Sequence, residues 1–202
     1  MKSYAERIYT STGITTKNIF SNGEKVLHVG SGSRVLPGAT TIDILPLPGV
    51  DVVHDLDVTP WPYEDNSFDV VYGHNVFEHL TDQLSAMSEV WRVLKPNGRV
   101  VITVPYFRSV DAFSDPTHKH FFTSKTMDAF LESDSGVASY AYTQKRFTKI
   151  GFWYGWPQPS KNPFIRVFKN FLYSHQDLYD SHLSLLFPAE IVIWELEVIK
   201  KP

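Results

Sequence analysis

The sequence predicts a single α/β domain with a mostly parallel, twisted sheet. Short apolar runs alternate with turns and helical stretches after residue 22. One amphipathic stretch ends at Lys95-Pro96-Asn97-Gly98 and lies between two apolar runs. A strand, a helix and a second strand in succession form a crossover connection, which makes neighbouring strands parallel and places helices on both faces of the sheet. The length of 202 residues is typical of one domain.

Five short apolar runs are predicted to be the core strands, because each is bounded by turn-forming residues. They are Lys25–Val29, Thr40–Ile44, Val50–His54, Phe68–Tyr72 and Arg99–Val104. A helix is predicted over Asp82–Leu94, where apolar residues recur at steps of three and four. The proline and glycine that follow cannot continue this helix.

The second half of the chain has a weaker pattern. Ser124–Glu132 is predicted to be a helix, with Thr123 or Ser124 as its N-cap. Strands are predicted at Phe147–Tyr154 and Glu190–Ile199, and we expect the last strand to be antiparallel. The stretch between them is long for a connection and contains a helical patch at Phe164–Leu172. We therefore divide the single domain into an N-terminal arm (1–23), a core (24–154), a small inserted helical cap (155–188) and a last strand (189–202).

Composition excludes several classes of protein. The chain has no cysteine, which excludes disulfides, zinc–thiolate sites, iron–sulfur clusters and a cysteine nucleophile. No run approaches the ~18 apolar residues of a membrane span, and the first residues contain no apolar signal segment. With a net charge of −3 we expect no nucleic-acid partner, and we expect a cytoplasmic location. No feature indicates an oligomeric state.

Ligands of open parallel sheets bind at the carboxyl ends of the strands, and the candidate site residues lie there. They are Gly30, Gly32, Asp43, Asp55, His74, Asn75 and His79. An acid at the end of the second strand can accept hydrogen bonds from a ribose, and an acid after the third can lie near an adenine. The dinucleotide fingerprint fails because Val35 occupies its third position, and no P-loop motif is present. An adenosyl ligand without a pyrophosphate, such as S-adenosylmethionine, fits this pattern better.

Several segments resemble those of class I S-adenosylmethionine-dependent methyltransferases. VLHVGSGSR is similar to their first motif, and DNSFDVVYGHNVFEHL and EVWRVLKPNGRVVITVP are similar to later ones. GSGSRVLPGATTIDILPLPGVDVVHDL resembles a bacterial and archaeal branch with a shortened first helix, and DPTHKHFFT resembles its segment after the fifth strand. The resemblance covers about residues 24–130. It implies a Rossmann-like fold, S-adenosyl-L-methionine as cofactor and methyl transfer as activity.

The resemblance also implies cofactor-binding residues by position. The methionine-binding turn of the family corresponds to Gly30, Ser31 and Gly32, and its ribose-binding acid with the next residue corresponds to Asp43 and Ile44. The pair near the adenine corresponds to Asp55 and Leu56, and the residues that flank the methionine correspond to His74 and Asn75. Two positions depart from the family. His28 stands where an acid is usual, and Arg34 replaces a small residue.

Three hypotheses compete for the run Asp115–His120, which lies after the fifth strand. In the first hypothesis, His118 or His120 serves as the general base that removes the proton of a methyl acceptor. Alternatively, Asp115, His118 and His120 bind a metal ion. In the third hypothesis these side chains only shape the loop by hydrogen bonding. Glu78 and His79, near the start of a helix, either complement its dipole or contact the ligands.

The sequence therefore predicts an S-adenosylmethionine-dependent methyltransferase that acts on a small-molecule, sugar-linked or lipid-linked acceptor. One alternative is a non-catalytic adenosyl-binding module of the same fold, and another is a metal-dependent hydrolase built on Asp115, His118 and His120. The aromatic segment Phe164–Tyr173 is interpreted as helical core packing, as a substrate lid or as a peripheral membrane contact. The acceptor itself is chosen by loops, which the motifs do not describe.

Overall fold

The structure is a computed structural model that describes residues 23–34, 36–133, 136–140, 142–155 and 163–200. The predicted N-terminal arm, residues 1–23, lies outside the described residues except for Gly23.

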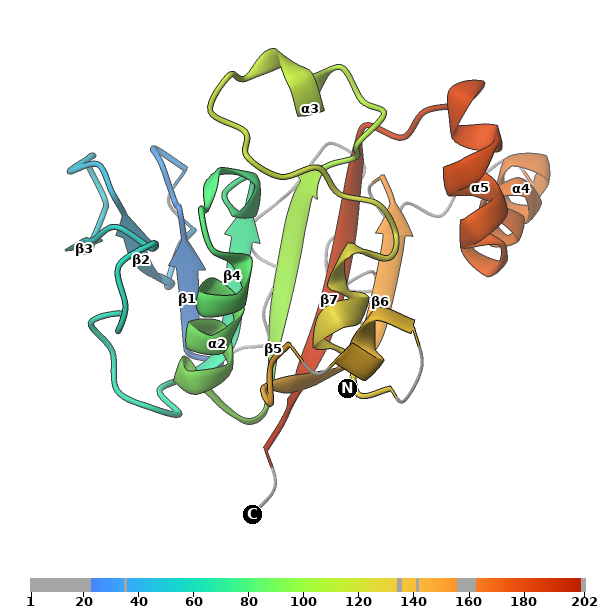
Figure 1. The fold of residues 1–202 in the computed structure, drawn as a ribbon. Coiled ribbons are helices and arrows are strands. Elements are labelled where there is room, and N and C mark those ends of the chain that lie inside the picture. The colour runs from blue at the N-terminus through green and yellow to red at the C-terminus, as the bar shows by residue number, and fades with distance from the viewer. Residues whose placement is uncertain (1–22, 35, 134–135, 141, 156–162, 201–202) are drawn as a thin grey trace.

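A seven-stranded sheet runs through the molecule in the order β3-β2-β1-β4-β5-β7-β6 (Figure 1). Its strands are β1 (Val26–Val29), β2 (Thr40–Asp43), β3 (Val52–Val53), β4 (Phe68–His74), β5 (Leu94–Pro105), β6 (Arg146–Tyr154) and β7 (Ile191–Ile199). The first five pair in parallel, whereas β7 runs antiparallel to both β5 and β6. The predicted Rossmann-like α/β fold with an antiparallel C-terminal strand is therefore confirmed.

Helix α2 (Gln83–Val93) forms where the three- and four-residue spacing predicted it. Asp82 caps its N-terminus, because its Oδ1 accepts hydrogen bonds from the backbone N–H groups of Leu84 and Ser85 at 2.9 and 3.1 Å. The helix ends at Leu94, whose extended backbone begins β5. The next four residues interrupt the pairing of β5 with β4, so that Phe68 faces Leu94 and Val70 faces Arg99.

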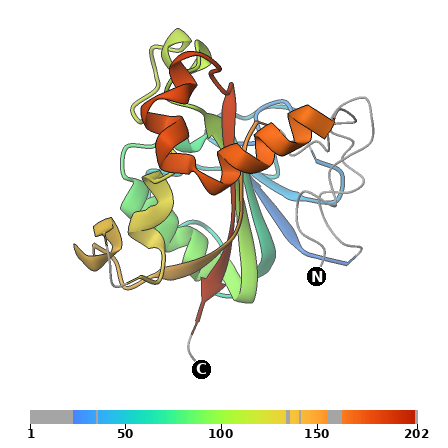
Figure 2. The same cartoon turned by 90° about the vertical axis from the view of Figure 1, so that its right-hand side faces the viewer.

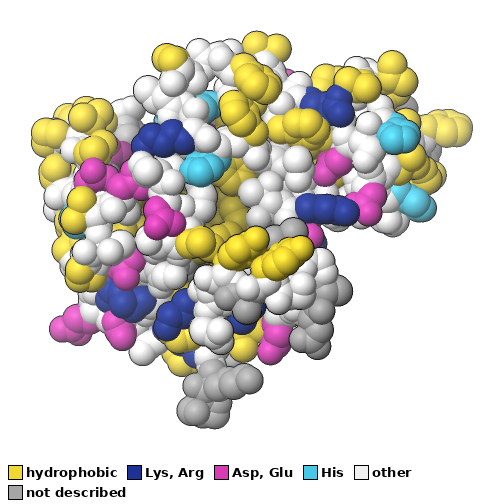
Figure 3. All heavy atoms as spheres, viewed as in Figure 1, with side chains coloured by type: hydrophobic (Ala, Val, Ile, Leu, Met, Phe, Trp, Pro, Cys, Tyr) yellow, Lys and Arg dark blue, Asp and Glu magenta, His cyan; other side chains and the backbone are white. Residues whose placement is uncertain are grey.

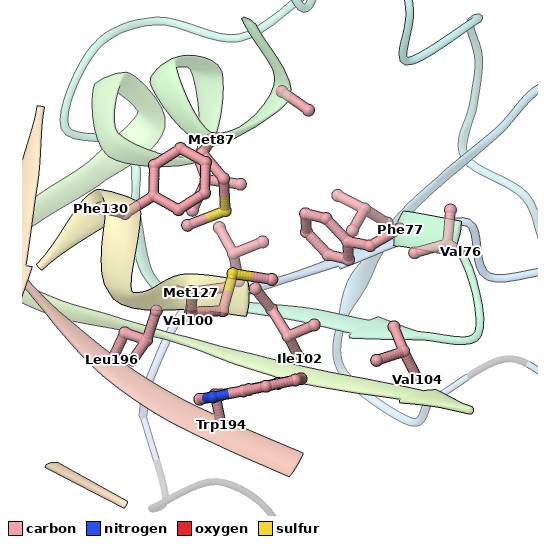
Figure 4. Close-up of a cluster of buried hydrophobic side chains, with 14 of the residues drawn as sticks. Val76, Phe77, Met87, Val100, Ile102, Val104, Met127, Phe130, Trp194 and Leu196 are labelled. Atoms are coloured by element: carbon pink, nitrogen blue, oxygen red, sulfur yellow. The ribbon is translucent and has the colours of Figure 1, made fainter. Parts of the chain in front are cut away.

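The main hydrophobic core lies between the sheet and the helices on one of its faces (Figures 2 and 4). Alternate residues of β5 and β7 point to this face, including Ile102 and Trp194, which are fully buried. They pack with Met87 of α2 and with Met127 and Phe130 of the 3-10 helix η3 (Thr126–Phe130). Each fully buried side chain of this size contributes roughly 1.5–3 kcal/mol to folding, so this layer holds the sheet rigid beneath the loops.

The prediction of a regular helix over Ser124–Glu132 is wrong in type and extent. The segment forms only η3, and Leu131 adopts an extended backbone with φ −81° and ψ 151°. Leu131 forms a β-bridge with Phe147 of β6, which requires an extended conformation and ends the helical turn. A tertiary contact therefore overrides the local helical propensity. A further 3-10 helix, η4, spans Gly136–Tyr140.

The opposite face of the sheet carries a more polar layer. Arg99 of β5 donates from both terminal nitrogens to the carboxylate of Glu24, at 2.7 and 3.0 Å. Its Nε lies 3.1 Å from Glu195 of β7, which is fully buried. A small apolar cluster that includes Tyr72 and Val101 lies on the same face. This layer joins the parallel part of the sheet to the antiparallel hairpin.

The predicted cap contains α4 (Pro163–Ser174), α5 (Gln176–Ser181) and the 3-10 helix η5 (Leu183–Leu185), all between β6 and β7 in the chain. Asp180 attaches it to the core. Its Oδ1 accepts the hydroxyl groups of Tyr106 and Tyr154 at 2.8 and 2.7 Å, and its Oδ2 accepts the N–H and hydroxyl of Ser124 at 2.9 and 2.7 Å. The cap is thereby held next to the loop that follows β5 (Figure 1).

None of the helices in the described part of the chain has the length and hydropathy of a membrane span.

Candidate functional site

The turn after β1 is built around two glycines with left-handed backbones. Gly30 has φ +59°, and a Cβ placed on it would lie 2.2 Å from Cγ2 of Val76. Gly32 has φ +54°, but a Cβ there would meet nothing within 4 Å. Both positions favour glycine because L-residues rarely adopt this backbone. Gly30 thus lets the turn pack against the segment after β4, whereas Gly32 faces open space.

Asp43 connects the end of β2 to this turn. Its side chain is almost fully buried, its Oδ2 accepts the N–H of Gly32 at 2.8 Å, and its Oδ1 accepts the N–H of Leu45 at 2.9 Å. Each carboxylate oxygen can accept more than one hydrogen bond. Asp43 therefore retains the capacity to bind the ribose hydroxyls for which the sequence proposed it. Ile44, next to it, is 59% exposed.

Ser31 provides a test of whether a polar ligand fits the turn. Its side chain is 3% exposed, and its Oγ has no hydrogen-bond partner in the described ranges of the chain. Buried polar atoms are nearly always paired, so an unpaired hydroxyl between two glycines indicates a place for a polar ligand group. Together with the open space at Gly32 and the acceptor oxygens of Asp43, the turn fits an S-adenosylmethionine molecule.

Asp55 and Leu56 follow β3 at the same edge of the sheet, because the N–H of His54 donates to the carbonyl of Asp43 at 2.9 Å. Asp55 is exposed and Leu56 is buried. The carbonyl of Leu56 accepts the indole N–H of Trp61 at 3.0 Å. Trp61 is 1% exposed and packs in the core, so it does not cover an adenine edge.

His28 and Arg34, the two residues that depart from the family pattern, do not add a buried positive charge to the turn after β1. His28 is 1% exposed, its ring lies 5.1 Å from that of Tyr72, and burial lowers its pKa to about 4. Burial likewise lowers the pKa of His74 to about 4, with a smaller effect from the charge of Arg34. Both histidines are therefore neutral near pH 7. Arg34 itself is exposed, and its N–H donates to the carbonyl of Ser31 at 3.0 Å.

A cavity of about 420 Å³ opens beside the turn, at the carboxyl ends of β4 and β5. It is lined by Asn75, Glu78, His79, Asp111, Asp115 and His118, among other residues. Asn75 precedes Val76, which packs on Gly30, so the cavity adjoins the turn. The molecular surface is hollowed below the α3 (Asp111–Ser114) loop, and histidine side chains lie near this hollow (Figure 3).

Glu78 is the most unusual side chain of the cavity. It is 1% exposed, and neither of its carboxylate oxygens has a hydrogen-bond partner among the described residues. Burial raises the pKa of Glu78 to about 7. The nearest basic atom is Nε2 of His118, 4.0 Å from its Oε1. The site therefore contains acceptor atoms that no donor of the described residues satisfies.

Hydrogen bonds orient the two histidines around Glu78. His118 Nδ1 lies 3.0 Å from the carbonyl of Ala112, which can only accept, so Nδ1 carries the proton and Nε2 keeps a lone pair. His79 Nδ1 lies 2.9 Å from Oγ1 of Thr117. That hydroxyl donates to Asp115 at 2.6 Å and therefore accepts from His79. His79 thus also keeps a lone pair on Nε2, and burial lowers its pKa.

His120 lies apart from this group. Its N–H and that of Lys119 both donate to the carbonyl of Glu78, at 3.3 and 2.8 Å, which holds the loop against the end of β4. Its ring does not line the cavity, and its Nε2 is buried without a hydrogen-bond partner. Of the residues proposed for catalysis or metal binding, the structure brings Asp115 and His118 to the cavity and leaves His120 outside it.

The sequence did not distinguish between a dipolar role and a ligand-contacting role for Glu78 and His79, yet both residues line the cavity. Their signal was the position directly after a core strand, which they share with His74 and Asn75. A purely dipolar role does not fit the tertiary structure, because η2 (Phe77–His79) is only three residues long and Glu78 and His79 line the cavity together with residues after β5.

Comparison with known proteins agrees with this architecture. The structure resembles an S-adenosylmethionine-dependent methyltransferase from Mesorhizobium loti, with a TM-score of 0.54 and 14% identity over 87% of this chain and 91% of that one. A methyltransferase from Archaeoglobus fulgidus gives a TM-score of 0.54 and 17% identity over 87% of this chain and 86% of the other. At sequence identities of 14% and 17%, these similarities show a shared fold and no more.

The sequence matches are local. Residues 10–102 match the family described as a methyltransferase domain. A stretch of 44 residues is 52% identical to a glycine/sarcosine/dimethylglycine N-methyltransferase of Actinopolyspora halophila, and covers 22% of this chain and 8% of that protein. Another of 70 residues is 39% identical to a demethylmenaquinone methyltransferase of Staphylococcus epidermidis, over 32% of this chain and 29% of the relative. The chain thus spans less than a third of the length of these relatives.

Residues 10–102, less than half of the chain, thus match a methyltransferase-domain family, and the fold of the described residues resembles that of S-adenosylmethionine-dependent methyltransferases.

Proposed function

We propose that this protein transfers a methyl group from S-adenosylmethionine to a small-molecule, sugar-linked or lipid-linked acceptor. The observation that carries the proposal is the contact between the two parts of the site. The cavity begins at Asn75, directly next to the Val76 side chain that packs on the Gly30 turn. A ligand in the turn and a ligand in the cavity would therefore be neighbours, as a transfer reaction requires.

Each part of the site has a separate role in this proposal. The turn from Gly30 to Gly32 holds the methionine portion of the cofactor, and Asp43 binds its ribose. Asp55 and Leu56 lie where the adenine would be, with Asn75 near the methyl end. Bound S-adenosylmethionine supplies an electrophilic methyl group to a nucleophilic atom of the acceptor. Of the two candidate bases, we favour His118 because it lines the cavity and keeps a lone pair on Nε2.

The size of the cavity and the surface of the cap support the choice of acceptor class. About 420 Å³ is a typical volume for a small-molecule pocket. On α4, Phe164 and Val167 are 83% and 67% exposed, and hydrophobic side chains gather over α4 and α5 (Figure 3). Asp180 holds this apolar surface next to the loop after β5. An acceptor with a lipid portion would find apolar contacts there.

Isothermal titration calorimetry with S-adenosylmethionine, S-adenosylhomocysteine and NAD tests the cofactor part. We expect micromolar binding of both adenosyl ligands and no binding of NAD, which would require room for a pyrophosphate. Absence of adenosyl binding would contradict the proposal.

Release of S-adenosylhomocysteine in the presence of a panel of acceptors then tests transfer. The panel should pair soluble acceptors with lipid-linked forms that carry the same nucleophile. Turnover supports the enzyme, whereas tight cofactor binding without turnover across the panel favours the alternative of a non-catalytic binding module. Hydrolysis of an ester or phosphate panel with added metal would favour the hydrolase alternative.

A further inference from the structure

The cavity contains three ligand atoms arranged as a metal site. Glu78, His79 and His118 each offer one such atom, and these atoms lie within 4.8 Å of one another. All three residues line the cavity. They come from two segments of the chain, the loop after β4 and the loop after β5, so the cluster exists only because the sheet brings these loops together.

The hydrogen bonds on the far side of each ring are those of metal-binding histidines. In metal sites the second ring nitrogen usually donates to a carbonyl, a carboxylate or another fixed acceptor, which orients the ring and sets its tautomer. Here His118 Nδ1 donates to the carbonyl of Ala112 at 3.0 Å. His79 Nδ1 donates to Thr117 at 2.9 Å, and Thr117 in turn donates to Asp115 at 2.6 Å. In the neutral rings both Nε2 atoms are left with lone pairs.

Glu78 supplies an independent observation. Its side chain is 1% exposed, and within the part of the chain that the structure describes both of its oxygens lack a hydrogen-bond partner. The groups that face it within the cluster, His79 and His118, present lone pairs rather than protons. Three acceptors that converge without a donor are complementary to a cation.

From this geometry we propose that Glu78, His79 and His118 bind one divalent first-row transition metal ion, with its remaining coordination positions open to the cavity. Two imidazole nitrogens and one carboxylate oxygen suit zinc, cobalt, manganese or iron rather than calcium. Ligand atoms on a tetrahedral zinc ion are about 3.4 Å apart, so pairs within 4.8 Å must close by up to roughly 1.4 Å. The Glu78–His118 pair, at 4.0 Å, must close by about 0.6 Å.

This site differs from the one that the sequence suggested, because Glu78 and His79 replace Asp115 and His120 as ligands. Asp115 instead orients His79 through Thr117. Metal binding is measured without methyl transfer. A metal on His118 Nε2 would also exclude this atom from acting as a base, so the same measurement decides between the two roles of His118.

The test uses the 202-residue chain without a histidine tag, treated with a chelator and then titrated with zinc chloride by calorimetry. Cobalt chloride added to a second sample reports coordination through its visible absorption bands. We expect one ion per chain. Less than about 0.2 ion per chain for both metals would overturn the proposal, whatever the variants do.

Variants locate the ion. Glu78→Gln and His118→Ala should weaken zinc binding at least tenfold, and His182→Asn, which changes an exposed histidine outside the cluster, should leave it unchanged. Thr117→Val removes the acceptor of His79 Nδ1, and changes at such supporting positions lower metal affinity about 10–100-fold. Stoichiometric binding that persists in both Glu78→Gln and His118→Ala would place the ion elsewhere. S-adenosylmethionine affinity, measured on the same samples, should stay within twofold of the unchanged chain and so separates loss of the metal site from loss of the fold.

Discussion

Asp43 holds the turn after β1 before any ligand binds, because its two oxygens already accept the N–H groups of Gly32 and Leu45. A single carboxylate therefore shapes the turn and, in the proposed function, binds the ribose. Its position at the end of β2 was visible in the sequence, but its hydrogen bonds to the turn were not.

Asp43→Ala should weaken S-adenosylmethionine binding, because it removes both the ribose acceptor and the support of the turn. Loss of such hydrogen bonds costs on the order of 1–3 kcal/mol, or about 5–150-fold in Kd. Calorimetry on the variant checks this. Asp69→Ala is the matched control, since Asp69 lies at the opposite end of β4 and should leave the affinity unchanged. An unchanged Kd for Asp43→Ala would remove this residue from the site.

Gly30 and Gly32 share a left-handed backbone but differ in their surroundings. Gly32→Ala should cost about 1–2 kcal/mol of unfolding free energy, from backbone strain alone. Gly30→Ala adds a clash with Val76, and such overpacking costs about 1–3 kcal/mol more. Urea denaturation of the two variants measures the difference. Equal losses of stability would mean that Val76 moves aside freely and that the packing of the turn on the end of β4 is not specific.

At the scale of elements, one side chain makes four of the hydrogen bonds that attach the helical cap to the core. Asp180 on α5 accepts four hydrogen bonds from the core, two of them from tyrosine hydroxyls. Burial raises the pKa of Tyr106 and of Tyr154, so both remain protonated donors at neutral pH. These contacts join the residue after β5, the end of β6 and the segment before η3 to the cap.

Asp180→Ala should therefore loosen the cap, with a loss on the order of 3 kcal/mol because several buried donors are left unpaired. Hydrogen exchange should show lost protection in α4 and α5, with α2 unaffected. Asp177→Ala on the same helix is the control. Asp177 forms an ion pair with Lys125, and the two side chains are 73% and 60% exposed. Such surface ion pairs contribute about 0–1 kcal/mol to the free energy of unfolding. If Asp177→Ala had the larger effect, Asp180 would not be the anchor of the cap.

The local pattern of apolar and turn-forming residues predicted most of the strands and helix α2. Strands β1, β2, β4, β6 and β7 lie within one or two residues of their predicted ends, and α2 lies within one residue of its predicted ends. The third strand is shorter than predicted, at Val52–Val53. The predicted helix at Ser124–Glu132 failed, because Leu131 pairs with β6. Its conformation was decided by a strand that lies more than ten residues further along the chain.

The stability of the whole molecule should depend on pH through the buried histidines. The folded pKa of His28 is about 4, below its ordinary value of 6.5. Between these values the unfolded chain binds a proton that the folded chain does not, so stability is fully present above pH 6.5 and falls as the pH drops towards 4. For His28 the loss between pH 7.5 and 5.0 is about 2 kcal/mol.

His28→Phe should remove this part of the pH dependence, because phenylalanine can pack against Tyr72 without titrating. Urea denaturation at pH 7.5 and pH 5.0 measures it in both proteins. His74 continues to contribute in the same direction, so the variant keeps some dependence. An equal difference between the two pH values in both proteins would show that His28 is accessible to protons in the folded state.

The sequence by itself determined the class of fold and the edge of the sheet where we propose that ligands bind. Strand alternation, the two glycines, Asp43 and the stopped helix α2 are patterns of neighbouring residues, and such patterns respond to local backbone preferences and burial. The tertiary structure alone decided what the site contains. Glu78 and His118 are 40 residues apart in the chain, and they meet because the parallel pairing of β4 and β5 brings the loops after both strands to the same edge. Convergence of this kind depends on the register of the sheet and the path of the loops, which no local pattern specifies.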